Sequence, residues 1–163
     1  MLQIRHAEPA DAVAISTLVQ QLTLRYIAPD CSEEGTALLL KSMSAEAIGG
    51  YIQQSHFDYL LGEVDGELVA VVATRDNSHL YHLFVVSHCQ GRGYAGELWT
   101  AAKTRCLQRA NTRVFTVNAS LAAVAVYQRF GFVVVAGRRE AQGIVDVPMQ
   151  LLLSDETATR AEF

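Results

Sequence analysis

The sequence predicts an α/β domain, in which helices pack against a β-sheet. The first observation is a run of apolar, aromatic and β-branched residues at 79–86, typical of a buried strand, followed at once by a glycine-rich turn and an amphipathic helix. The second is a hairpin signal, Asp65-Gly66, between two apolar runs. The third is that further strand-like and helical segments are interspersed on both sides of this region.

Length and composition indicate one globular domain with its own hydrophobic core. The chain has 163 residues, of which half are apolar and 18% are charged. We expect this domain to span residues 1–153 and a polar C-terminal tail to span residues 154–163. The net charge is −4 and the pI is about 5.7, which argues against nucleic acid as a partner because phosphate binding favours a basic face.

The cysteines and the hydropathy pattern indicate the compartment. The three cysteines are odd in number and lack metal-ligand spacing, so we expect free thiols and no metal site. Charged residues near the N-terminus, among them Arg5 and Asp11, argue against a secretory signal. No apolar run approaches the ~18 residues of a membrane span. These features predict a cytoplasmic protein that does not enter a membrane.

The first third of the chain predicts one strand and two helical regions. Residues 2–6 form a short strand. A helix that opens at a proline follows, and its apolar residues recur at helical spacing up to Tyr26, where Ala28-Pro29-Asp30 ends it. The second helical region runs from about Glu33 to Ser55, and Gly49-Gly50 can break or bend it.

The middle of the chain predicts three successive strands. Residues 57–64 and 67–74 form the hairpin, and Asp76-Asn77 turns the chain into the strand at 79–86. In the helix that follows, apolar residues recur from Ala95 to Cys106 at helical spacing.

The last part of the chain predicts a strand, a helix and two final strands. The strand covers residues 113–117. The helix covers residues 122–130 and is closed by a glycine at the position where a left-handed residue ends a helix. The final strands are 133–136 and 144–153, joined near Gln142-Gly143.

The glycine-rich turn after residue 86 predicts an anion site. The first N–H groups of a helix have no internal partner, and the helix dipole places partial positive charge there. Glycines at 91, 93 and 96 let the backbone approach a ligand closely, so the turn suits a phosphate or pyrophosphate. Arg92 could add a mobile charge.

Two nucleotide-binding patterns are disfavoured. Gly91, Gly93 and Gly96 spell the dinucleotide fingerprint, which would suit a nicotinamide-dependent oxidoreductase. That fingerprint requires an acidic residue about 20 residues further on, at the end of the next strand, whereas the strand here ends in Asn118. No P-loop motif occurs in the sequence.

The same turn fits another family. Gln90-x-x-Gly93-x-Ala95 resembles the Q/R-x-x-G-x-G/A signature of the GNAT superfamily of N-acetyltransferases. Further on, Asn118 followed by a helix that ends Tyr127-x-x-x-Gly131-Phe132 resembles the second signature of that family. The two motifs occur in the usual order and separation, and the resemblance covers residues 4–153. It implies a three-layer α/β fold with a mixed, largely antiparallel sheet.

The resemblance also implies acetyl-coenzyme A as co-substrate and a set of residues that bind it. The family holds the pyrophosphate on loop amides, which here belong to Gln90, Gly91, Arg92, Gly93, Tyr94 and Ala95. The family's pantetheine arm pairs with strand backbone between two splayed strands, and the corresponding residues are Leu83, Phe84 and Val85. Asn118 either bonds the pantetheine or caps the following helix.

The same comparison implies catalytic roles. Tyr127 matches the tyrosine that acts as general acid toward the coenzyme thiolate, and it also suits a core position. His79 and His82 are candidates for the general base, although structural roles and a water chain are equally open. Strand alternation places His79 and Tyr81 on one face and His82 on the other, unless a bulge intervenes.

These features predict direct transfer of acetyl from acetyl-coenzyme A to a primary amine in a ternary complex. The acceptor, a small molecule or a peptide, is left open, and so is a homodimer, which is common in the family. The alternative is a module that binds acyl-coenzyme A as a sensor without turnover.

Overall fold

The computed structural model describes residues 1–111 and 113–154. The predicted polar tail therefore lies outside the described residues, apart from Ser154. No helix in the described ranges has both the length and the apolar character needed to cross a membrane.

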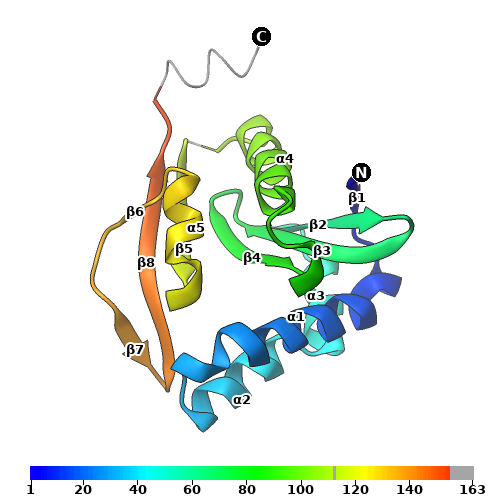
Figure 1. Cartoon of the computed structure of the whole chain (residues 1–163). Helices are drawn as coiled ribbons and strands as arrows, with labels where there is room; N and C mark the ends of the chain where they lie inside the picture. Colours follow the sequence, from blue (N-terminus) through cyan, green and yellow to red (C-terminus); the bar gives the residue numbers. More distant parts are fainter. Residues whose placement is uncertain (112, 155–163) are drawn as a thin grey trace.

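The centre of the molecule is a mixed, mostly antiparallel sheet (Figure 1). Its strands are β1 (Gln3–His6), β2 (Phe57–Val64), β3 (Glu67–Arg75), β4 (His79–Val85), β5 (Val114–Ala119), β6 (Val133–Val134), β7 (Arg139–Ala141) and β8 (Ile144–Leu152). They lie in the order β1-β2-β3-β4-β5-β8-β6, and β7 pairs with β8. Every pairing is antiparallel except that of β4 with β5.

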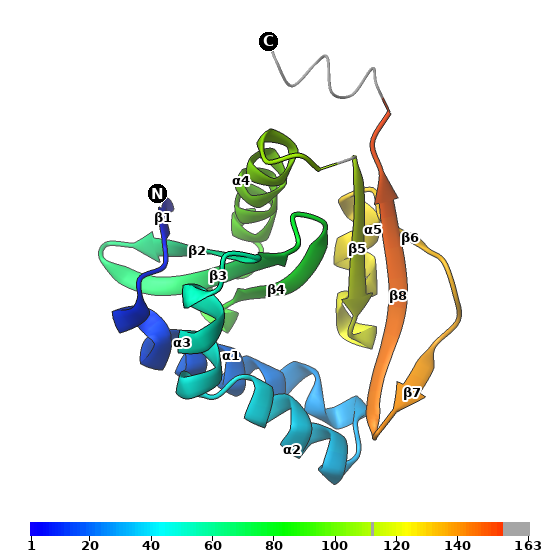
Figure 2. The same ribbon diagram turned by 180° about the vertical axis from the view of Figure 1, so that it is seen from behind.

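Helices cover both faces of this sheet, which confirms the predicted three-layer architecture. The α-helices are α1 (Ala12–Tyr26), α2 (Glu33–Ser42), α3 (Ala45–Gln53), α4 (Tyr94–Gln108) and α5 (Val124–Arg129). Short 3₁₀ turns precede or link them at Pro9–Asp11, Ala28–Asp30, Ser87–Cys89 and Leu121–Ala123. Figure 2 shows α1, α2 and α3 on one side of the sheet and α4 and α5 on the other.

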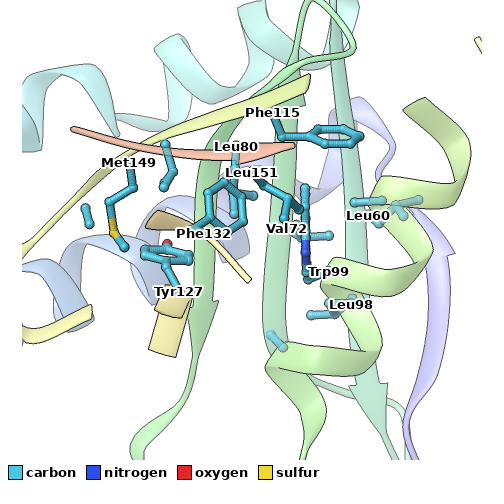
Figure 3. Packing of buried hydrophobic residues seen from close by; sticks show 14 of the residues in the cluster. Leu60, Val72, Leu80, Leu98, Trp99, Phe115, Tyr127, Phe132, Met149 and Leu151 are labelled. Carbon is cyan, nitrogen blue, oxygen red and sulfur yellow. The ribbon is translucent and has the colours of Figure 1, made fainter. Parts of the chain in front are cut away.

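Each face of the sheet has its own apolar core. On the side of α4 and α5, Trp99 stands edge-on to Phe115 with ring centroids 5.2 Å apart, and Phe132 packs on the same indole (Figure 3). On the side of α1 and α3, Ile15 and Ile48 are fully buried against β2 and β3. A fully buried side chain of this kind contributes roughly 1.5–3 kcal/mol, so both helical layers are held on the sheet by side-chain burial.

The predicted helical region at 33–55 divides at Met43 rather than at its glycine pair. The Ser44 hydroxyl accepts a hydrogen bond from the Ala47 amide at 3.1 Å and so begins α3. Gly49 and Gly50 lie inside α3. The cap therefore decides where the chain turns, and the glycines do not interrupt the helix.

A β-bulge changes the predicted alternation along β4. Ala73 of β3 pairs with His82 whereas Thr74 pairs with Leu80, so Tyr81 is an extra residue on β4. As a result, Tyr81 and His82 both lie on the side of α1 and α3, with their rings stacked 4.4 Å apart. Simple alternation would place Tyr81 and His82 on opposite faces, and the bulge is the exception that the sequence analysis allowed for.

Candidate active site

The sheet is open between β4 and β5. These parallel strands pair only through His79 with Thr116 and Leu80 with Val117. Beyond Leu80, β4 stays paired with β3, and beyond Val117, β5 stays paired with β8. The two strands therefore diverge toward their C-terminal ends, and each has a backbone edge that the other does not satisfy (Figure 1).

A cavity of about 1080 Å³ occupies this divergence and extends to both sides of the sheet. At one end it meets the loop before α4 and one side of α5. At the other end it meets α1, α2 and β8. Among the lining residues are the predicted site residues His79, His82, Leu83, Phe84, Val85, Gln90, Gly91, Gly93, Tyr94, Ala95, Asn118 and Tyr127.

The loop before α4 presents a row of amides without acceptors. The N–H groups from Gly91 to Gly96 donate to no residue that the structure describes. Glu97 is the first residue after them whose amide has an acceptor, the Gly93 carbonyl at 3.1 Å. Gly91 and Gly93 have φ values of +79° and +83°, and a Cβ at either would meet nothing within 4 Å. The loop is therefore uncrowded, and its free amides lie beside the cavity at the positive end of α4, an arrangement that suits a pyrophosphate.

The side chains of Gln90 and Arg92, two predicted loop residues, differ in whether the protein holds them. The Gln90 side-chain amide donates to the Val85 carbonyl at 3.0 Å, so it ties the loop to the end of β4. Arg92 is exposed and contacts none of the described side chains through an ion pair or hydrogen bond, so its guanidinium is free to reach a ligand.

Asn118 is held by a residue that sequence reasoning missed. The Arg139 guanidinium donates to the Asn118 side-chain oxygen at 2.8 Å and to Asp146 at 2.5 Å. The N-cap position of the 3₁₀ turn that follows, Leu121–Ala123, is Ser120, so Asn118 does not cap it. Arg139 faces Asp146 only because β7 pairs with β8 in that register, which no local signal in the sequence reveals.

Tyr127 lies on α5 and combines a core position with a place on the cavity wall. Its ring packs against Phe130 and Phe132 with centroids 6.4 and 5.7 Å away, as Figure 3 shows for Phe132. The side chain is 7% exposed, and no described residue hydrogen-bonds its hydroxyl. Burial raises the pKa of Tyr127 above its usual value near 10, so the phenol keeps its proton at neutral pH.

The two histidines differ in environment. His82 is 4% exposed, lies 3.2 Å from the Tyr59 hydroxyl through Nδ1, and burial lowers its pKa to about 3. His79 is half-buried, and its Nδ1 lies 2.8 Å from the Thr116 hydroxyl. Burial, and then the charge of Arg75, lower the pKa of His79 below its ordinary value. Both imidazoles are neutral at pH 7, but only that of His79 is open enough to exchange a proton.

The side of the cavity toward α1 and α2 was not predicted in residue detail. Its wall includes the apolar residues Leu22, Ile27, Leu39 and Met43. The Tyr26 hydroxyl lies 2.9 Å from the Ser87 hydroxyl, and this contact joins the end of α1 to the start of the anion-binding loop. No local pattern distinguished these residues from ordinary core positions.

The two walls meet where α2 touches the turn between β7 and β8. The Ser32 amide donates to the Gly143 carbonyl at 2.9 Å. A Cβ on Gly35 would lie 2.2 Å from that carbonyl oxygen, so the backbones approach as closely as glycine allows. This contact connects the α1–α2 layer to the β7–β8 hairpin across the far side of the cavity.

The described residues hold no group of three or more histidine, cysteine, aspartate or glutamate side chains that could bind a metal ion. Cys31, Cys89 and Cys106 are free thiols. The groups at the cavity that can act in chemistry include the backbone amides of the loop, the protonated phenol of Tyr127 and the neutral imidazole of His79.

Comparisons with known proteins agree with this geometry. Residues 27–153 match the model of the acetyltransferase (GNAT) domain family. A GCN5-related N-acetyltransferase from Rhodopseudomonas palustris is similar in structure, with a TM-score of 0.80 at 20% identity over 93% of this chain and 95% of the other. The PaiA N-acetyltransferase from Thermoplasma acidophilum, solved with coenzyme A, has a TM-score of 0.79 at 16% identity over 94% and 99%. A search of curated proteins found no match.

Proposed function

The chain belongs to the GNAT acetyltransferase family, and on that premise we propose that it transfers acetyl from acetyl-coenzyme A to a primary amine, which attacks directly within a ternary complex. One observation carries this proposal. The unpaired amides of residues 91–96 lie at the end of a gap between two splayed strands, so a diphosphate and an extended arm can be held side by side.

The residues present fit a coenzyme A thioester. The open edge of β4 at Leu83, Phe84 and Val85 offers backbone groups to the amides of a pantetheine arm. Arg139 fixes the Asn118 side-chain oxygen, which leaves the Asn118 NH₂ group available to the cavity. A solved relative of the same fold was crystallised with coenzyme A, which supports this assignment. When bound, acetyl-coenzyme A supplies an activated acyl group, its thioester.

The transfer forms one N–C bond and breaks one C–S bond, so one proton must leave the amine and one must reach the departing thiolate. Tyr127 is assigned the second task. Its phenol is protonated at neutral pH, it lines the cavity, and no described residue competes for its proton. A backbone amide of β4 directed at the thioester oxygen would stabilise the developing negative charge.

The amine must arrive at the carbonyl carbon without its extra proton. His79 is the better placed of the two predicted bases, because it is half-buried, lines the cavity and is neutral at pH 7. His82 is assigned a structural role, since a pKa of about 3 makes it a poor proton acceptor for an ammonium group. We place the general-base role on His79, acting directly or through water.

Thiol release tests this proposal. The purified protein is incubated with acetyl-coenzyme A and a panel of amino acids, polyamines, aromatic amines and peptides, and calorimetry measures coenzyme A binding in parallel. Amine-dependent release of free coenzyme A is expected. Binding of acetyl-coenzyme A without release for any amine would instead identify a sensing module, and absence of both would contradict the whole assignment.

A further inference from the structure

The half of the cavity that faces α1 and α2 carries almost no negative charge. Among the described residues that line the whole cavity, Asp146 is the one carboxylate. The Arg139 guanidinium donates to both of its oxygens, at 2.5 and 3.5 Å. A carboxylate already bound to a guanidinium attracts a second cation weakly. An acceptor with several positive charges would therefore find no unpaired carboxylate among the described residues that line the cavity.

Arg75, in contrast, is a cation with unused donors. Its guanidinium lies 5.7 Å from the centre of the Tyr81 ring, which orients it at the cavity wall. Arg75 forms an ion pair with Asp76, in which Nε lies 3.7 Å from Oδ2, beyond hydrogen-bond distance, and the Asp76 side chain is 63% exposed to solvent. None of the described residues accepts a hydrogen bond from the Arg75 side chain. A planar guanidinium held in this way matches the two oxygens of a carboxylate.

His79 lies next to Arg75 at the cavity wall. After burial, the charges of Arg75 and Arg139 both lower the pKa of His79, and Asp76 alone opposes them. His79 lies beside Arg75 because the two residues pair across β3 and β4. The guanidinium of Arg75 therefore lies close to the proposed general base, although the whole chain carries a net charge of −4.

Much of the remaining wall is apolar, although Tyr26, Ser42 and Arg129 also line the cavity. Leu22, Ile27, Leu39 and Met43 from the α1–α2 region face the cavity opposite Ile144 of β8. The contact between Gly35 and Gly143 joins these two walls and limits the room beyond them. An acceptor body made of carbon would bury its surface here, whereas a charged chain would lose its hydration without a partner.

We propose that the acceptor is a small amine that carries a carboxylate and an apolar body, in the manner of an apolar α-amino acid, and that Arg75 binds its carboxylate. This inference rests on the proposed function, since it names the acceptor class of the same site. In the transfer, the amino nitrogen forms a bond to the acetyl carbon, the carbon–sulfur bond breaks, and the carboxylate takes no part in the bond changes. Arg75 thus acts in binding and selection.

The test compares acids with their amides. Thiol release is measured for L-leucine and L-phenylalanine, for L-leucinamide and L-phenylalaninamide, and for spermidine. Each amide keeps the amine and the apolar body of its amino acid but lacks the carboxylate. The wild-type protein is expected to prefer the free acids over the amides by about 10-fold or more in kcat/KM, as expected for a charged hydrogen bond, and to use spermidine least.

Variants of Arg75 test whether this residue causes the preference for free acids over amides. Arg75→Gln is expected to raise KM for the free acids about 10- to 100-fold relative to KM for the amides, and Arg75→Lys should restore part of the preference. Arg138→Gln removes the same charge from an exposed residue outside the cavity and should change nothing. Thermal unfolding of each variant shows whether it is folded.

The outcomes separate the two proposals. Equal use of acids and amides by the wild type, or a preference for spermidine, overturns this inference and leaves amine acetylation standing. An unchanged acid preference in Arg75→Gln overturns the role of Arg75. Thiol release with none of the panel amines contradicts the proposed function and removes the basis of this inference with it.

Discussion

Replacing Tyr127 with phenylalanine separates its chemical role from its packing role. The substitution removes one oxygen and keeps the ring that packs on Phe130 and Phe132. No described residue hydrogen-bonds the hydroxyl, so no internal hydrogen bond is lost, and the free energy of unfolding should change by less than about 1 kcal/mol. The folded site should therefore survive intact.

The effect on turnover should be much larger. Without the phenol, the thiolate leaves without a proton, and a positioned general acid contributes roughly 10²–10⁴-fold. We expect kcat to fall at least about 100-fold, or about 2.7 kcal/mol in activation free energy, while the Kd for acetyl-coenzyme A stays the same. Stopped-flow thiol release gives kcat, and calorimetry gives the Kd.

Tyr59→Phe is the matched control for this variant. Burial raises the pKa of Tyr59 as well, but its hydroxyl contacts His82 and the residue does not line the cavity. This control should lose some stability and keep its turnover. If Tyr127→Phe turns over as fast as wild type, or if both variants slow equally, Tyr127 is not the acid and the thiolate leaves by another route.

Three further predictions concern pH, packing and the anion loop. Burial lowers the pKa of His82 from 6.5 to about 3 in the folded state, so folding favours the neutral imidazole. The stability that depends on this neutral form is fully present above about pH 6.5 and is lost as the pH falls toward 3. At pH 5 the free energy of unfolding, measured with urea, should be lower by about 2 kcal/mol, and this pH-dependent loss should be absent in His82→Gln. Gly35→Ala should lower the free energy of unfolding by roughly 1–3 kcal/mol, because the new methyl group meets the Gly143 carbonyl. The control Gly49→Ala, in the interior of α3, should be neutral or stabilising. If the two variants change the free energy of unfolding equally in chemical denaturation, the close contact at Gly35 is refuted. Gly93→Ala puts a methyl group beside the loop amides and strains a φ of +83°, so the Kd for acetyl-coenzyme A should rise about 10-fold by calorimetry, and an unchanged Kd would exclude this loop as the binding site.

The parts of the fold that local chemistry determines were predictable. The Asp65-Gly66 hairpin and the strand–loop–helix unit around residue 90 are confirmed, because turn residues and hydrophobic period act over a few positions. The Ser44 cap was also readable in principle, since serine before a helical run is a start signal, but the glycine pair drew the expected break to the wrong place.

The acceptor side depended on contacts between distant segments. Tyr81 gives no local sign of being the extra residue of a bulge, because it is as suitable for a strand as its neighbours. Arg139 reaches Asn118 only through the pairing of β5, β7 and β8. Arg75 likewise becomes a cavity residue only once β3 and β4 are aligned. Pairing register between strands sets these positions, and a single sequence does not contain it.

The amides of residues 91–96 give the most direct test of the central claim. Hydrogen exchange, read residue by residue with NMR, reports whether each amide has an acceptor. In the free protein these amides should exchange rapidly, and saturating acetyl-coenzyme A should slow them while the amides of β2 stay as they were. Amides that are already protected without ligand, or that exchange equally fast with it, would contradict the account.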